Sequence, residues 1–200
     1  MGVGFIERAY ELQDRLRTRL FTWLLAGQFK EFGHGSRITP PFRFWGLHEI
    51  AVGENVIINR DCWIQTIPNA SGEASSKLKI GSHAGIGMGT CISAAESVLI
   101  GEHVLLARNV YISDHSHAYE RLDLPIADQG IDRMAPVSIG ANTWLGQNVV
   151  VLPGVTIGRH CVIGANSVVK DSIPDFSVAV GSPARVVRRF NRSTARWERV

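Results

Sequence analysis

The chain has 200 residues, 45% of them hydrophobic, and a formal net charge of +3 at pH 7. This length and composition allow one packed domain with a helical appendage, and the mild charge predicts no nucleic-acid partner. Three widely spaced cysteines, Cys62, Cys91 and Cys161, argue against a disulfide framework and predict a reducing, cytoplasmic compartment. No run of about 18 apolar residues occurs, so we expect no membrane span. Acidic residues near the start interrupt any secretory signal.

Residues 5–26 carry apolar side chains at helical spacing, which predicts an amphipathic helix within an N-terminal segment of residues 1–31. The apolar stripe consists of Phe5, Ala9, Leu12, Leu16 and Leu20. We expect this helix to pack on the domain that follows it or on a neighbouring subunit. Its arginine, tryptophan and leucine content also permits weak, shallow association with a membrane surface.

Residues 32–175 contain a repeat in which an aliphatic residue returns at every sixth position. Such a unit is too short for a helix and suits a short strand and a turn, with one side chain pointing inward. Stacked units then share one continuous aliphatic core, since no unit can bury its own face. A weaker set, Phe32, Ile38 and Phe44, suggests a degenerate first turn. The clear positions fall into five groups of three: Val52, Ile58, Ile64; Ile80, Ile86, Ile92; Ile100, Leu106, Ile112; Ile139, Leu145, Val151; Ile157, Ile163, Val169.

Every insertion in this repeat falls between groups of three and never inside one. If three units make one coil, all extra loops leave from the same edge of a three-sided prism. We therefore predict an all-β fold, a parallel β-helix with three hexapeptide rungs per coil. Its longest insertion spans about residues 117–138. Residues 176–200 then predict a closing strand or turn and a basic tail that cover the open end of the coil.

The histidines differ in their position within the repeat. His83, His103 and His160 lie at the turns of first units, where solvated side chains explain them. His115 lies at the edge from which the insertions emerge, immediately before the longest loop, and long loops are usually functional or disordered. A neutral imidazole, with a reference pKa near ~6.5, can accept a proton near pH 7. His117 is the competing candidate, and a purely structural role for both histidines is the third possibility.

The tandem units resemble the hexapeptide-repeat acyltransferases, whose fold is a left-handed parallel β-helix. The run "PVSIGANTWLGQNVVVLPGVTIGRHCVIGANSVV", continuing through "IP" to "GSPARVV", is similar to their branch of sugar, polysaccharide and antibiotic O-acetyltransferases. Together with "DHSH", the resemblance covers about residues 50–190. It implies acetyl-CoA as co-substrate and a homotrimer with three active sites at subunit interfaces.

The resemblance also implies roles for individual residues. The family's catalytic base, a histidine at the start of the inserted loop, corresponds to His115, which would remove the proton from an acceptor hydroxyl as that hydroxyl attacks the thioester. The coenzyme-binding positions correspond to Trp144 near the pantetheine arm, to Ala165, and to Arg185 and Arg188. The two arginines suit phosphates because a guanidinium pairs with phosphate in a forked geometry. A tryptophan that only packs between subunits is the alternative for Trp144.

Asp114 and His117 are weaker candidates for contact with the acceptor. An orienting role for Asp114 behind the imidazole conflicts with strand alternation, which would point adjacent side chains apart. The chain also departs from the family at two places. Lys170 and Asp171 stand where many relatives have Thr and Lys, and Gly89 stands where galactoside and maltose enzymes have an acceptor-contacting Asn. The acceptor is therefore not expected to be a simple galactoside.

The N-terminal helix and the loop "LPIADQGIDRMAPV" resemble enzymes that acetylate cell-surface polysaccharides or their lipid-linked precursors. We therefore expect an O-acetyltransferase that acts on a sugar hydroxyl, in the cytoplasm or at the inner face of the membrane. The alternatives are a virginiamycin-type antibiotic O-acetyltransferase, a sugar N-acetyltransferase and a non-catalytic scaffold. A γ-type carbonic anhydrase would hold zinc through histidines and needs an H-x₄-H pair, which the sequence lacks. No metal requirement is expected.

Overall fold

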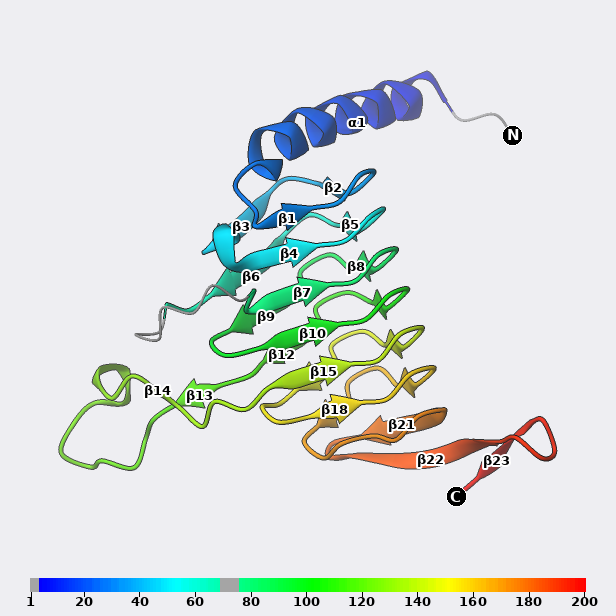
Figure 1. Cartoon of the computed structure of the whole chain (residues 1–200). Coiled ribbons are helices and arrows are strands. Elements are labelled where there is room, and N and C mark those ends of the chain that lie inside the picture. Colours follow the sequence, from blue (N-terminus) through cyan, green and yellow to red (C-terminus); the bar gives the residue numbers. More distant parts are fainter. Residues whose placement is uncertain (1–3, 69–75) are drawn as a thin grey trace.

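The computed structural model describes residues 4–68 and 76–200. The helix α1 (Phe5–Ala26) lies across one end of a stack of parallel coils, and a long loop leaves the stack from one edge (Figure 1). Each coil contributes one short strand to each of three parallel sheets. The architecture is the predicted left-handed parallel β-helix.

We name the sheets A, B and C in the order in which the chain enters them. Sheet A contains β1 (Glu31–Phe32), β4 (Ile50–Val52), β7 (Leu78–Ile80), β10 (Val98–Ile100), β15 (Val137–Ile139) and β18 (Thr156–Ile157). Sheet B contains β2 (Arg37–Ile38), β5 (Ile57–Ile58), β8 (Gly85–Ile86), β11 (Leu105–Leu106), β16 (Trp144–Leu145), β19 (Val162–Ile163), β21 (Ser177–Gly181), β22 (Ala184–Asn191) and β23 (Arg196–Arg199). Sheet C contains β3 (Phe42–Trp45), β6 (Cys62–Thr66), β9 (Cys91–Ala94), β12 (Tyr111–Ser113), β17 (Val150–Val151) and β20 (Val168–Val169).

The remaining elements lie outside the three faces. A small antiparallel pair, β13 (Ser116–His117) and β14 (Ile131–Asp132), begins and ends the inserted loop. Two short 3₁₀ helices complete the described secondary structure, η1 (Leu47–Glu49) before β4 and η2 (Ile126–Asp128) within the loop.

Neighbouring coils are in register at the predicted inward positions. Val52, Ile80, Ile100, Ile139 and Ile157 pair in turn along sheet A. The predicted positions of sheets B and C pair in the same way. All fifteen side chains are at most 3% exposed, so the three-unit coil and its aliphatic core are confirmed. The degenerate first turn is also a true coil, because Phe32, Ile38 and Phe44 continue the same three rows.

The three corners of the prism carry different residues. At the corner between sheets A and B, His83 and His103 have positive φ and their rings stack with centroids 4.7 Å apart. At the corner between sheets B and C, Asn109, Asn148 and Asn166 have positive φ and form a ladder of side-chain hydrogen bonds of 3.3 and 2.9 Å. Asparagine tolerates this left-handed conformation better than most residues. The insertions leave from the third corner, between sheets C and A, as predicted.

The helix α1 packs on the first coil through Thr18 and Thr22 and through the partly buried side chains of Phe21 and Leu25. Strand β2 is at the end of sheet B, so the N–H and carbonyl groups of Ile38 on its outer side have no partner strand. Edge strands need another partner for such groups. Thr22 is this partner, since the Ile38 N–H donates to Thr22 Oγ1 at 2.9 Å and the hydroxyl donates to the Ile38 carbonyl at 3.3 Å. Arg60 also donates to Asp14 at 2.8 Å. The helix therefore lies on the domain that follows it, which is one of the two expected placements, but the residues of the apolar stripe do not make this contact: Phe5 is 87% exposed and Leu16 57%.

The C-terminal segment continues sheet B. Strand β21 pairs in parallel with β19, with Val178 opposite Val162 and Ala179 opposite Ile163. The chain then reverses, and β22 and β23 add two antiparallel strands. In Figure 1 this hairpin projects sideways beyond the prism.

Candidate active site

His115 lies at the corner between sheets C and A, two residues after the end of β12. Its Nδ1 atom is 2.8 Å from Oδ1 of Asp114, and its side chain is about one-tenth exposed. The side chain of Asp114 is completely buried. The alternation argument against this pair does not hold, because both residues lie beyond the last residue of the strand, where the chain no longer follows strand geometry.

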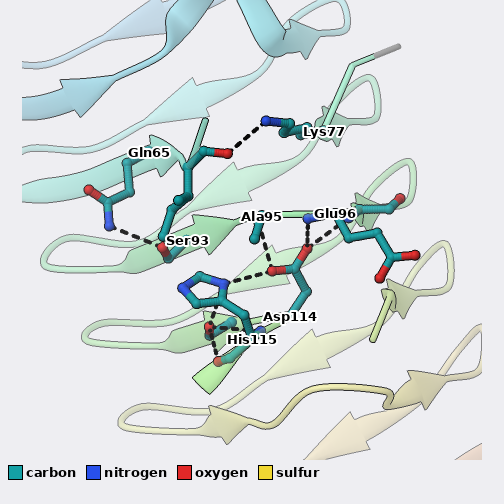
Figure 2. A network of polar contacts seen from close by, with 10 residues as sticks. Gln65, Lys77, Ser93, Ala95, Glu96, Asp114 and His115 are labelled. Carbon is teal, nitrogen blue, oxygen red and sulfur yellow. Dashed lines mark hydrogen bonds and ion pairs between the residues drawn. The ribbon is translucent and has the colours of Figure 1, made fainter. Parts of the chain in front are cut away.

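The carboxylate of Asp114 is held by three successive backbone amides (Figure 2). Oδ1 accepts the N–H of Ala95 at 2.8 Å, and Oδ2 accepts those of Glu96 at 2.8 Å and Ser97 at 2.7 Å. These amides belong to the connection between β9 and β10. The inward residues on either side of it, Ile92 and Ile100, are eight positions apart, two more than the six of the regular repeat. The extra residues therefore build a cradle for the carboxylate that contacts the imidazole. A substrate-contacting role for Asp114 is not supported, because its oxygens are buried and occupied.

This arrangement fixes the proton position on the imidazole. Since Asp114 can only accept, Nδ1 carries the hydrogen and Nε2 presents a lone pair. Ser113 contributes to the same geometry, because its hydroxyl donates to the His115 carbonyl at 2.8 Å. An imidazole held in one tautomer by a buried carboxylate is chemically able to act as a general base.

A row of polar side chains runs from the imidazole across the outer face of sheet C. Ser113, Ser93 and Gln65 are register partners on adjacent strands. Gln65 donates to Ser93 Oγ at 3.0 Å (Figure 2), and Trp63 donates from Nε1 to Gln65 Oε1 at 3.1 Å. Sequence analysis did not identify this row, although the pairing of β12 with β9 and of β9 with β6 that produces it follows from the repeat.

His117 does not share this environment. It lies on β13, opposite Ile131 of β14, and its side chain is exposed. The inserted loop carries several exposed apolar side chains, namely Tyr119, Leu122, Ile126 and Met134. The loop contains two exposed ion pairs, Arg121 with Asp123 and Arg133 with Glu120.

The predicted coenzyme residues lie elsewhere on the prism. Trp144 stands on β16 at the outer face of sheet B, about half exposed. Ala165 lies at the exposed corner between sheets B and C, and Arg185 and Arg188 lie on β22 of sheet B. In a three-sided prism sheet B is opposite the corner between sheets C and A. One protomer therefore does not bring these residues to its own His115.

Asp171 joins two cations near this sheet. It is 3.0 Å from Lys170 Nζ and 3.0 Å from Arg185 Nη1. The hydrogen bond from Lys170 lowers the pKa of the Asp171 carboxyl below its usual value, and the charge of Arg185 acts in the same direction. All three side chains are about half exposed. The departure from the family pattern thus introduces a carboxylate that competes with anionic ligands for Arg185.

The three cysteines of the described residues are all free thiols. Burial raises the pKa of Cys62 to about 11 and also raises the pKa values of Cys91 and Cys161, which disfavours the nucleophilic thiolate. In the same part of the chain, no three His, Cys, Asp or Glu side chains are grouped closely enough to hold a metal ion. Within it, no helix is long and apolar enough to cross a membrane.

Comparison with known proteins finds a transferase family and several acetyltransferases that are similar to parts of the chain. Residues 136–171 match the family described as bacterial transferase hexapeptide (six repeats). A probable acetyltransferase of Mycobacterium tuberculosis is 46% identical over 121 residues, and a putative lipopolysaccharide biosynthesis O-acetyl transferase of Escherichia coli is 41% identical over 114 residues. These alignments cover 60% and 54% of this chain but only 39% and 58% of those relatives.

Two further comparisons cover most of the chain. The N-acyltransferase AntD from Bacillus cereus, solved with dTDP and 3-hydroxybutyryl-CoA, superposes with a TM-score of 0.71 over 87% of this chain and 90% of that chain, and its 19% identity shows the shared fold. The galactoside O-acetyltransferase of Escherichia coli is 31% identical over 187 residues, which are 90% of each protein. The chain therefore belongs to the hexapeptide-repeat acetyltransferases.

Proposed function

We propose that the protein transfers an acetyl group from acetyl-CoA to a hydroxyl of a sugar, with His115 as the general base. The observation that carries this proposal is the contact of His115 Nδ1 with a buried carboxylate that three backbone amides hold in place. Nε2 then accepts the acceptor hydroxyl proton while the oxygen attacks the thioester carbonyl. The carbon–sulfur bond breaks, and the imidazolium returns the proton to the departing coenzyme A sulfur.

The acceptor that we favour is a cell-surface polysaccharide or its precursor. This class is supported by the relatives named for lipopolysaccharide biosynthesis and for galactoside acetylation. Of the polar row, Ser113 and Ser93 are buried, whereas Gln65 at its far end is only partly buried and offers an amide group that suits a sugar. Gly89, with φ of +72°, lies beside Asn109 at the corner between sheets B and C, away from His115 of the same protomer. An acceptor other than a simple galactoside is proposed from the family likeness alone.

We further propose that the active unit is a homotrimer. His115 and the sheet B residues Trp144 and Arg188 lie on opposite sides of one prism, so a site that uses all three needs two protomers. The exposed apolar side chains of the inserted loop, among them Leu122 and Ile126, suit contact with a neighbouring copy. A cyclic trimer then contains three identical sites.

The outward apolar stripe of α1 suits weak contact with a membrane surface, which would place the enzyme beside lipid-linked precursors. Leu12, Leu16 and Trp23 are all more than half exposed on the side away from the first coil. This association, at the inner face of the cytoplasmic membrane, is part of the proposal.

The proposal is tested by following thiol release from acetyl-CoA with a panel of sugars, nucleotide-sugars, amino-sugars and streptogramin-type antibiotics. We expect turnover with a sugar hydroxyl acceptor and a fall of ~10²–10⁴-fold in kcat for His115→Ala. His117→Ala is the matched control and should retain most of the activity. Full activity of His115→Ala, or turnover with amines alone, would refute the assignment.

A further inference from the structure

The hairpin β22–β23 presents two arginines and two aromatic rings on one face. Arg188 is directly opposite Arg199, and Phe190 is directly opposite Trp197. Directly opposed residues of an antiparallel pair share a face, and so do residues two apart on one strand. The two rings contact each other, with centroids 5.5 Å apart and planes inclined at 66°.

The Arg188–Arg199 pair is unusual because like charges directly opposite each other destabilise a sheet. Within the described chain, the carboxylates of this region do not neutralise it. Glu198 lies on the other face of the hairpin, opposite Arg189, and accepts hydrogen bonds from Asn191 and Thr194. Asp171 pairs with Arg185 and Lys170. Two opposed guanidinium groups without a carboxylate between them suit a bound dianion.

This face continues a row that begins at Trp144. Along the outer face of sheet B, Trp144 is opposite Val162, Val162 is opposite Val178, and Val178 is opposite Arg188. Adjacent strands lie ~4.8 Å apart, so Arg199 is about four strand spacings, or ~19 Å, from Trp144 along the row. The row changes from an aromatic ring to apolar side chains and then to paired cations. That order matches a ligand with an extended neutral arm and an anionic nucleotide at its far end.

We infer that Arg199 and Trp197 complete, with Arg188 and Phe190, a subsite for the 3′-phosphoadenosine end of coenzyme A. The guanidinium groups of Arg188 and Arg199 bind the 3′-phosphate from two sides. The rings of Phe190 and Trp197 contact the adenine. This inference rests on the proposed function, because it takes acetyl-CoA as the co-substrate. It adds two residues, Trp197 and Arg199, to the coenzyme contacts. Both lie on β23, a strand that follows the "GSPARVV" motif.

The test compares binding of coenzyme A and 3′-dephospho-coenzyme A to the full-length protein by calorimetry. We expect Arg199→Gln to weaken binding of coenzyme A by about tenfold or more and to leave the dephospho compound unaffected, so that discrimination between the two is lost. Arg196→Gln removes the same charge from the same strand, but on the opposite face beside Asn191, and should change neither affinity. Trp197→Ala should weaken both ligands by a similar factor, about three- to tenfold, because both contain adenine.

Three outcomes would overturn the inference. One is equal loss for Arg199→Gln and Arg196→Gln, which would indicate only a general charge effect. The second is equal loss of both ligands in Arg199→Gln, which would place the arginine on another group. The third is unchanged binding of coenzyme A in Arg199→Gln. In all three cases the wild-type protein still binds coenzyme A, whereas a wild-type protein that does not bind it would refute the proposed function itself. Melting temperatures of the variants check that the exposed hairpin remains folded.

Discussion

At the scale of single residues, Asp114 determines what His115 can do. Its carboxylate accepts three backbone N–H groups and lies 2.8 Å from the imidazole Nδ1. A buried acceptor with this many partners has one stable orientation, because any rotation would leave a buried amide without a hydrogen bond. Under the proposed function Asp114 is therefore a positioning residue, because it acts through the imidazole and leaves Nε2 to accept the proton of the acceptor hydroxyl.

Asp114→Asn tests this role. The substituted amide turns an N–H₂ group either toward the backbone donors or toward Nδ1, and the latter forces the proton onto Nε2. We expect kcat to fall by up to ~10⁴-fold, as for other bases held in the wrong tautomer, with little change in the KM for acetyl-CoA. Ring ¹⁵N shifts of His115 should report the altered tautomer, a signal that a purely structural loss would not produce.

Asp132→Asn is the matched control, since it removes an exposed carboxylate from the inserted hairpin. A folded Asp114→Asn protein that keeps its proton on Nδ1 and its turnover within about threefold would contradict the positioning role.

The sequence was sufficient to identify His115 as a candidate, because the repeat shows which edge carries the insertions. It was not sufficient to find the Asp114 contact, since the alternation rule applies only inside a strand and β12 ends at Ser113. The amide cradle of Ala95, Glu96 and Ser97 was visible only as two extra residues between Ile92 and Ile100. A length change reveals an insertion but not which side chain its backbone will bind.

At the scale of elements, the helix α1 has acidic residues on the side that faces the first coil and arginines beside its outward apolar stripe. Helical spacing places Glu7, Glu11 and Asp14 on the side of Thr18 and Thr22, which faces the first coil. Arg8 and Arg19 flank the outward stripe instead. The sequence predicted both helix and stripe but not which face packs, because that choice depends on the unpaired Ile38 backbone that Thr22 satisfies.

This arrangement predicts binding to anionic membranes. We expect the wild-type protein to sediment with vesicles that contain phosphatidylglycerol and much less with phosphatidylcholine alone. Leu16→Glu should reduce the bound fraction at least tenfold, since it loses the burial of one leucine, about 1.5–3 kcal/mol, and adds a repelled charge. Leu99→Glu, a similarly exposed leucine on sheet A, is the control and should bind normally.

Arg8→Gln with Arg19→Gln should weaken binding to the anionic vesicles only, and added salt should have the same effect. If Leu16→Glu instead changes the mass of the protein in solution without lipid, the stripe is a contact between copies and the membrane role is refuted.

At the scale of the whole molecule, the prism itself separates the two halves of the proposed site. The base lies at the corner between sheets C and A, and the row from Trp144 to Arg188 lies on sheet B, the face opposite that corner. The register of all coils followed from the six-residue repeat. The assembly did not, because the repeat fixes contacts within a chain and not which face meets a neighbour.

Mixing two inactive variants tests whether the site is shared between protomers. His115→Ala retains an intact sheet B, whereas Trp144→Ala combined with Arg188→Ala retains an intact base. If each site takes His115 from one protomer and sheet B from the next, every mixed trimer of a cyclic assembly regains one wild-type site of its three. Random reassociation of equal amounts makes about three quarters of the trimers mixed, so about one quarter of wild-type activity should return. Thiol release after co-refolding measures this, and mixing without exchange is the control. No recovery from confirmed mixed trimers would mean that one protomer contains the whole site, which would contradict the shared arrangement.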